Sequence, residues 1–245
     1  TLARAATPAM DDAAEKERAE ALRQSISIIG QVAMEWAAKG DTRPHLHYLQ
    51  GRGFTDSTLA TARERQCIGF LPVDSRELTD LLSTEIGRPL LEKAGLWKSD
   101  KKMPGIINRP LVLFLPGLNS AEFCLIQKPH GNYAKRIRYG STPYPYFWPG
   151  TNPHSDAVGI TEGFFDLLAL SQINPQHDIL GIPGAGAWNE ALFASYHACQ
   201  THPKTFHIWL DGDSAGRSGA SNIASTLQRL GIHYKVHELD RKSVV

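Results

Sequence analysis

The sequence predicts an α/β protein in which a mainly parallel sheet flanked by helices follows a mixed α+β segment. Residues 156–240 alternate short apolar runs with helical stretches, an order typical of a parallel sheet covered on both faces. Residues 12–95 have mostly helical periodicity, and apolar runs bounded by turn residues follow them up to residue 139. The 245 residues suffice for two domains, which we expect at 1–150 and 151–245.

In the first half we expect helices followed by strands. Apolar residues from Leu22 to Trp36 recur every three to four positions, which predicts a long amphipathic helix over 12–39. Further helices are predicted at 43–50, 56–65 and 76–94, and strands at 110–116, 122–128 and 133–139. The stretch 140–155 is rich in proline and aromatic residues, which predicts a surface loop.

In the second half we expect strands and helices in strict alternation. The predicted strands are 157–160, 178–182, 206–210 and 233–239, and the predicted helices are 162–172, 188–199 and 216–230.

The composition indicates a globular chain with no membrane partner. Hydrophobic residues make up 42% and charged residues 21%, and no apolar run approaches the ~18 residues of a membrane span. The three cysteines (Cys67, Cys124 and Cys199) lie far apart in the sequence. They therefore predict neither a disulfide framework nor a zinc finger, and they favour a reducing, cytoplasmic compartment.

The net charge of +1 conceals an uneven distribution along the chain. Residues 101–150 hold seven basic side chains and one acidic side chain, whereas residues 151–200 hold five acids and no Lys or Arg. This order predicts a basic surface for phosphates beside an acidic pocket for cations. The alternative is chance clustering on a solvated face.

Acidic residues follow two of the predicted strands. Glu162 comes directly after the strand at 157–160, and Asp211 and Asp213 come directly after the strand at 206–210. Ligands of such sheets bind at the carboxyl ends of the strands, so these carboxylates are expected to converge. Hard oxygen donors suit Mg²⁺ or Mn²⁺. Each motif taken alone has a simpler interpretation. The DGD tripeptide could be a solvated turn, and Glu162 could be an acidic residue that interacts favourably with a helix N-terminus.

The two acidic motifs together resemble the Toprim family. The pattern EGxxD runs from Glu162 to Asp166, and DxDxxG runs from Asp211 to Gly216; the resemblance covers residues 156–240. It implies a Toprim-type sheet. Glu162 would act as general acid/base or metal ligand, and the two Asp residues of the DGD turn would bind the metal. Gly163, Asp166 and Gly216 would support this site.

The upstream half is similar to bacterial and phage DnaG-type primases. The elements, in the family's order, are YLQGRGF at 48–54, CIGFLP at 67–72, AGL at 94–96, NRPLVLF at 108–114 and KRIRY at 135–139. The resemblance implies a DNA primase core that makes short RNA primers from NTPs on a single-stranded DNA template, with Mg²⁺ or Mn²⁺. It also implies a phage or mobile-element context, the cytoplasm of a bacterial or phage-infected cell, and a replicative helicase as partner. The family's zinc-binding and helicase modules, and its acidic element after the last Toprim strand, are not found in this sequence.

Basic residues are the candidates for contacts with template or nucleotide phosphates, because Lys and Arg supply such contacts without reading sequence. They are Arg109, Lys128, Lys135, Arg136, Arg138 and Arg217. In the strand that contains KRIRY, Arg136 and Arg138 are expected on one face and Lys135 on the other. Arg52 is a supporting candidate, with a helix-capping loop as its structural alternative.

Two other functions remain open. One is a metal-dependent Toprim nuclease that cuts a phosphodiester with the same carboxylates. The other is a non-catalytic nucleic-acid-binding module that keeps the fold.

Overall fold

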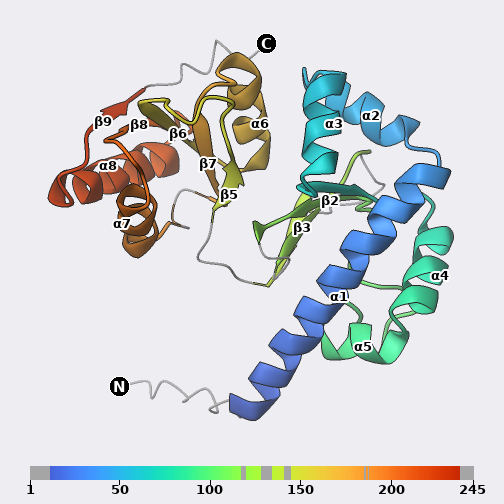
Figure 1. Ribbon diagram of the computed structural model, residues 1–245. Helices are drawn as coiled ribbons and strands as arrows, with labels where there is room; N and C mark the ends of the chain where they lie inside the picture. Colours follow the sequence, from blue (N-terminus) through green and yellow to red (C-terminus); the bar gives the residue numbers. More distant parts are fainter. Residues whose placement is uncertain are drawn as a thin grey trace. The chain divides into compact units, whose positions relative to one another are not determined.

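The computed structural model describes residues 12–116, 120–127, 134–140, 145–184, 186 and 188–237 (Figure 1). The helices are α1 (Asp12–Lys39), α2 (Arg43–Gln50), α3 (Asp56–Glu64), α4 (Ser75–Glu85), α5 (Arg88–Lys93), α6 (Phe164–Ile173), α7 (Glu190–Ala198) and α8 (Ser214–Arg229). The strands are β1 (Ile68–Phe70), β2 (Leu111–Phe114), β3 (Ala121–Cys124), β4 (Arg136–Tyr139), β5 (Tyr146–Trp148), β6 (Ala157–Glu162), β7 (Asp178–Ile182), β8 (Thr205–Trp209) and β9 (Tyr234–Val236). Lys128 lies outside the described residues. Among the helices described, none is long and apolar enough to cross a membrane.

The chain folds into two compact units that interleave in sequence. The first contains the described parts of Thr1–His45, Gly69–Phe114 and Leu118–Gly140. The second contains the described parts of Leu46–Ile68 and Ser141–Val245, with a short piece around residue 115. The segment 46–68 therefore belongs to the same unit as the C-terminal half.

The first unit is a four-stranded sheet packed against helices. Its strand order is β1-β2-β3-β4, with β2, β3 and β4 antiparallel. Ile26 and Ile29 of α1 are fully buried and share one apolar core with Leu82 of α4 and Val112 and Phe123 of the sheet. Helices α1, α4 and α5 accordingly lie side by side (Figure 1). The long helix predicted over 12–39 is confirmed.

The helix predicted over 76–94 is wrong as a single element. Helix α4 ends at Glu85 and α5 begins at Arg88. Gly87 between them has φ +84°, a left-handed conformation that redirects the chain. Pro89 then occupies the first turn of α5, where the missing N–H costs nothing.

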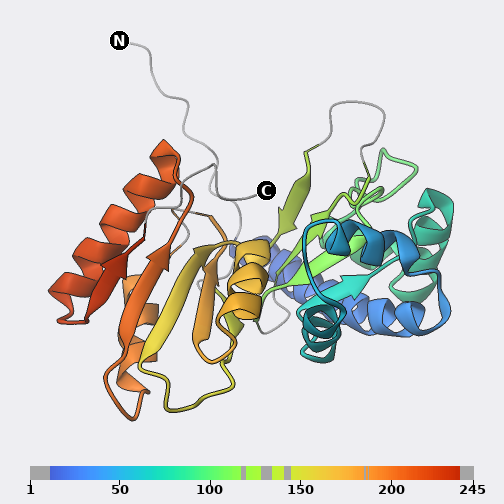
Figure 2. The same ribbon diagram turned by 90° about the horizontal axis from the view of Figure 1, so that it is seen from above.

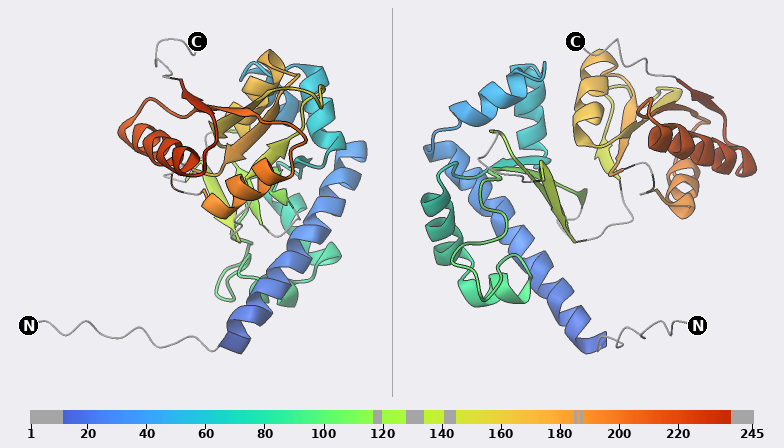
Figure 3. Two further views of the ribbon diagram at one scale, coloured as in Figure 1. Left: turned by 60° about the vertical axis from the view of Figure 1, so that its left-hand side comes forward. Right: turned by 180° about the vertical axis from the view of Figure 1, so that it is seen from behind.

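The second unit is a five-stranded sheet with helices on both faces. The order is β5-β7-β6-β8-β9, and all pairs are parallel except β5 with β7. Val158 and Ile160 point to a core that includes residues of α7 and α8. The opposite face at Gly159 meets Leu170 of α6, because successive residues of a strand face opposite sides. Figures 2 and 3 show α6 on one side of this sheet and α8 on the other. The predicted α/β class is confirmed.

Strand β5 corrects the predicted surface loop at 140–155. Tyr146 and Trp148 are buried, and Phe147 between them is 42% exposed. The strand pairs with β7 at the edge of the sheet. Pro145 and Pro149 flank the strand, and such positions are typical of a short edge strand. The strand was not predicted because prolines on both sides of it indicate a loop. The chain thus joins the second sheet before residue 150.

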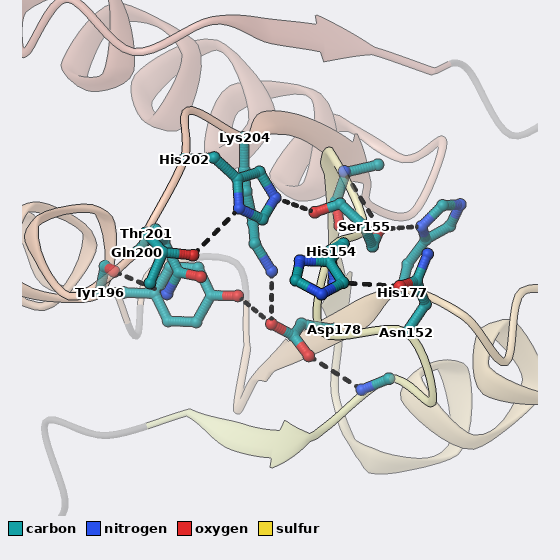
Figure 4. A network of polar contacts seen from close by, with 12 residues as sticks. Asn152, His154, Ser155, His177, Asp178, Tyr196, Gln200, Thr201, His202 and Lys204 are labelled. Atoms are coloured by element: carbon teal, nitrogen blue, oxygen red, sulfur yellow. Dashed lines mark hydrogen bonds and ion pairs between the residues drawn. The ribbon is translucent and has the colours of Figure 1, made fainter.

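A buried polar network fixes the amino-terminal edge of the second sheet (Figure 4). Asp178 accepts hydrogen bonds from Gly150 N (2.8 Å), Tyr196 OH (2.5 Å) and the Lys204 ammonium (2.9 Å). Burial alone would raise the pKa of Asp178, but these three donors outweigh it and hold the pKa below its usual value. Ser155 Oγ lies 2.5 Å from His177 Nδ1 in the same network. Loops at this edge are therefore bonded into the unit.

Candidate active site

Glu162 and Asp211 come to the same edge of the second sheet through strand register. Glu162 is the last residue of β6 and not the first residue of a helix, as the sequence had suggested. Thr161 pairs with Trp209 of the neighbouring parallel strand β8. Glu162 follows this pair by one residue and Asp211 follows it by two, on strands about 4.8 Å apart. Glu162 and Asp211 therefore lie at nearly the same level along two adjacent strands, at the carboxyl end of each.

Gly163 makes the turn from β6 into α6. Its φ is +92°, and its N–H donates to the Ile182 carbonyl at 2.7 Å. Only glycine adopts this conformation without strain. Asp166 is exposed in the first turn of α6, where the helix N-terminus stabilises negative charge. The EGxxD pattern thus encodes a sharp strand-to-helix turn with one carboxylate on each side of it.

The DGD turn after β8 is held by backbone contacts. Asp213 is the N-cap of α8, and its Oδ1 accepts from Gly216 N at 2.8 Å. The Arg217 guanidinium donates to the Gly212 carbonyl. A Cβ on Gly216 would lie 2.0 Å from the Asp211 carbonyl oxygen, so only glycine permits this close approach. The predicted helix start at 216 is therefore wrong by two residues, because the capping carboxylate allows the helix to begin at Ser214.

The donor chemistry at this edge fits a hard divalent cation. Carboxylate oxygens are the ligands that Mg²⁺ and Mn²⁺ prefer, and Glu162, Asp211 and Asp213 carry such oxygens at or just after the ends of two adjacent strands. Within the part of the chain that the structure describes, no group of three His, Cys, Asp or Glu side chains is arranged to hold a metal. Asp213 instead uses one oxygen to cap α8.

The predicted phosphate contacts of the first unit divide into two kinds. Arg109 is only 3% exposed, and its guanidinium donates to the carbonyls of Ala134 (2.9 Å) and Ile107 (3.4 Å). Arg109 therefore ties two loops together and borders a hollow of about 590 Å³. The other kind is exposed and lies in or next to β4.

The basic side chains of β4 and of Lys135, the residue before it, have different surroundings. Arg136 and Arg138 both pair with Glu122 of β3, Arg136 at 3.6 Å, which confirms that they share one face. Glu122 is 4% exposed, so this carboxylate depends on both guanidinium groups. Lys135 is exposed, and it takes part in none of the ion pairs found among the described residues.

Sequence similarity identifies the second unit. Residues 159–243 match the Toprim-like family. The chain contains a Toprim-like domain. No curated protein matches the chain in sequence.

Solved structures of similar fold extend this finding to the first unit. The zinc-binding and RNA polymerase domains of the Aquifex aeolicus primase align with a TM-score of 0.63 and 19% identity, covering 94% of this chain and 57% of that one. The RNA polymerase domain of Mycobacterium tuberculosis primase DnaG aligns at 0.61 and 18%, covering 92% and 76%. A DnaG catalytic domain bound to ssDNA aligns at 0.63 and 15%, covering 92% and 75%. The chain thus has the fold of a DnaG catalytic core, and it spans just over half of the Aquifex chain.

Two features, one in each unit, were not singled out from the sequence as site residues. Lys98, Lys101 and Lys102 line the hollow beside Arg109 in the first unit; the run KSDKK was a visible signal for them. In the second unit, residues 46–68 pack against α6 of the Toprim-like domain, where Gln172 Nε2 donates to the Gly53 carbonyl at 3.2 Å. No local pattern predicts that contact, because 119 residues separate its partners.

Proposed function

We propose that this chain is the polymerising core of a DNA primase, which joins nucleoside triphosphates into short RNA primers on single-stranded DNA. The observation that carries the proposal is the DnaG-core fold over most of the chain, combined with carboxylates at the carboxyl edge of the Toprim-like sheet. One structural relative is bound to ssDNA. A template strand of the same kind is the partner that we assign to this chain.

The three carboxylates have distinct proposed roles. Mg²⁺ or Mn²⁺, when bound, would neutralise charge on the reacting phosphates. Asp211 and Asp213 would hold the ion, and Asp213 has a second oxygen besides the one that caps α8. Glu162 would share the ion or accept the proton of the attacking hydroxyl. Gly163 and Gly216 position these groups by permitting the two tight turns.

Exposed cations of both units supply the proposed phosphate contacts. Lys135 and Arg136 are exposed and adjacent, and Arg217 lies in the first turn of α8. Arg109 is assigned a supporting role, because its buried guanidinium already serves backbone carbonyls. Lys128, the replicative helicase partner, the phage or mobile-element context and the cytoplasmic location stay predictions from the sequence.

The deciding assay offers a single-stranded template, four NTPs and Mn²⁺ to the full chain. We expect labelled oligoribonucleotides from the natural sequence and none from Asp211→Ala. Asp213→Asn separates metal binding from capping, since Asn caps a helix as well as Asp does. It should abolish synthesis while leaving thermal stability unchanged, whereas Asp213→Ala should also cost about 1 kcal/mol of stability.

Asp156→Ala is the matched control for this assay. Asp156 is exposed and precedes the same strand that ends at Glu162, but at the amino-terminal edge. The control should retain primer synthesis. Degradation of the template without synthesis would instead indicate the Toprim nuclease, and binding without either reaction would indicate the non-catalytic module.

A further inference from the structure

Strand β9 is the outermost strand of the second sheet, and among the described strands only β8 pairs with it (Figure 1). The strand has three residues, and its last two are exposed. A backbone hydrogen bond from His237 N to the Ile208 carbonyl (2.9 Å) follows its last residue. Short edge strands open locally at a small cost in free energy, so side-chain contacts determine how firmly this end of β9 is held.

One side-chain contact joins the end of β9 to β8. His207 is in register with Lys235, so His237, two residues beyond Lys235, lies on the same face of the sheet. Nδ1 of His207 lies 2.9 Å from Nε2 of His237. The ring centroids are 5.1 Å apart, a separation that exceeds the distance between the nitrogens by about the radii of the two rings. The two nitrogens therefore point at each other, as they do in an N–H···N hydrogen bond.

Trp209 fixes the plane of the His237 ring. The two rings stack with centroids 3.7 Å apart and planes 5° apart, and such stacking holds the imidazole against rotation out of its plane. Trp209 is the last residue of β8 and precedes Asp211 by two residues. The histidine contact therefore lies beside the strand that leads to the DGD turn.

The facing nitrogens of His207 and His237 can share one proton but not two. Of two neutral imidazoles, one donates its N–H and the other accepts. One added proton keeps the contact, because an imidazolium still donates to a neutral imidazole, with the help of its charge. A second proton places an N–H on both facing nitrogens, and two positive charges then repel each other. The contact is therefore closed at neutral pH and opens when both rings are charged.

The surroundings favour the neutral rings. Burial lowers the pKa of both His207 and His237 below 6.5. Charge on His237 lowers the pKa of His207 further. Lys235 and His177 act on His207 in the same direction, whereas Asp156 raises its pKa. The folded chain thus binds these protons less readily than the unfolded chain, so the contact stabilises β9 at neutral pH and is lost as the pH falls below 6.5.

We propose that His207 and His237 act as a pH-operated latch, which holds the end of β9 on β8 until both rings are protonated. This inference does not depend on the proposed function. The structural alternative is a metal ion bound by both rings. Among the residues that the structure describes, no third His, Cys, Asp or Glu side chain completes a metal site with this pair. An ion held at about 2 Å from each nitrogen also does not fit on a line of 2.9 Å between them.

The test follows the ¹⁵N-labelled full chain by NMR from about pH 8 to about pH 5, the range in which histidine titrates. Ring-nitrogen shifts report which nitrogen carries a proton. We expect the two rings to titrate together, each responding to protonation of the other, with midpoints below that of the exposed His154. Relative to the unstructured rate at the same pH, the His237 amide should exchange about fivefold faster at the lower pH, because one hydrogen bond is lost.

Two substitutions separate the latch from a simple loss of packing. In His207→Gln the amide still forms a hydrogen bond with His237 but does not titrate, so the His237 amide should stay protected at both ends of the pH range. His207→Ala removes the bond, so protection should be low at both ends. His154→Gln is the matched control at an exposed position and should behave as the natural chain does.

Four results would overturn the proposal. They are independent titration of the two rings at the midpoint of His154, unchanged protection of the His237 amide across the pH range, acid opening in His207→Gln, and ring shifts that change when EDTA is added, which would indicate a bound metal. Should His207→Ala not fold, the natural chain and His207→Gln still decide, since only the natural chain should open in acid.

Discussion

Gly216 shows at the scale of one residue how the candidate site depends on a missing side chain. The Asp211 carbonyl oxygen occupies the space in which a Cβ of residue 216 would lie, at 2.0 Å. The backbone of the acidic turn must therefore move in any variant at this position. Asp211 belongs to that turn, so the position of its carboxylate depends on a residue five places further along the chain.

We predict that Gly216→Ala lowers both stability and primer synthesis. Displacing the Asp211 backbone should cost about 2 kcal/mol or more, within the usual range for overpacking, measured by thermal or chemical unfolding. Gly186→Ala is the matched control, because a Cβ there would meet nothing within 4 Å. Equal unfolding midpoints for the two variants would contradict this account of the turn.

At the scale of an element, β4 and the residue before it hold cations in two different settings, paired with a buried carboxylate or exposed without an ion pair among the described residues. Period-two alternation predicted correctly that Arg136 and Arg138 share a face. It did not predict Glu122, because that carboxylate lies on β3, 16 residues away from Arg138. Of the basic run 135–138, Arg136 and Arg138 thus pair with the buried Glu122, whereas Lys135 is an exposed charge.

We predict that Lys135→Ala changes single-strand binding but not stability, whereas Arg138→Ala lowers stability. Lys135→Ala should reduce the salt dependence of single-strand binding by about 0.7 in the log–log slope, the loss of one phosphate contact, without lowering the Tm. Arg138→Ala should destabilise the protein by about 3 kcal/mol, because Glu122 loses a close partner while it remains buried. Titrations at several salt concentrations, together with unfolding curves, measure both effects. A flat salt response of the natural chain would refute the basic-surface prediction.

At the scale of the whole molecule, acid stability depends on a buried histidine. His45 is fully buried against Phe70, with ring centroids 4.7 Å apart. Burial lowers the pKa of His45 to about 4, from 6.5. Below pH 6.5 the imidazole of His45 is protonated in the unfolded chain, whereas in the folded chain it stays neutral down to about pH 4. The free energy of unfolding therefore decreases as the pH falls from 6.5 to about 4.

We predict that His45→Phe reduces this acid sensitivity. Between pH 7 and pH 4 the natural chain should lose about 3 kcal/mol more unfolding free energy than the variant, because burial lowers the pKa of His45 from 6.5 to about 4. Urea unfolding at the two pH values measures the difference. His47→Gln, an exposed position on the same helix, should behave as the natural chain does. If His45→Phe and the natural chain lost equal free energy, His45 would not be the group that titrates.

The sequence by itself determined the features that depend on local periodicity and on short motifs. The α/β class, helix α1, the parallel strands and the two turns that carry Glu162 and Asp211 all follow from residues within a few positions of one another. Tertiary structure decided the rest: the short strand β1, the edge strand β5 between two prolines, the pairing of Glu122, and the packing of residues 46–68 on α6. These features depend on hydrogen bonds and contacts between residues far apart in the chain, and local sequence pattern does not encode which distant partner a side chain will meet.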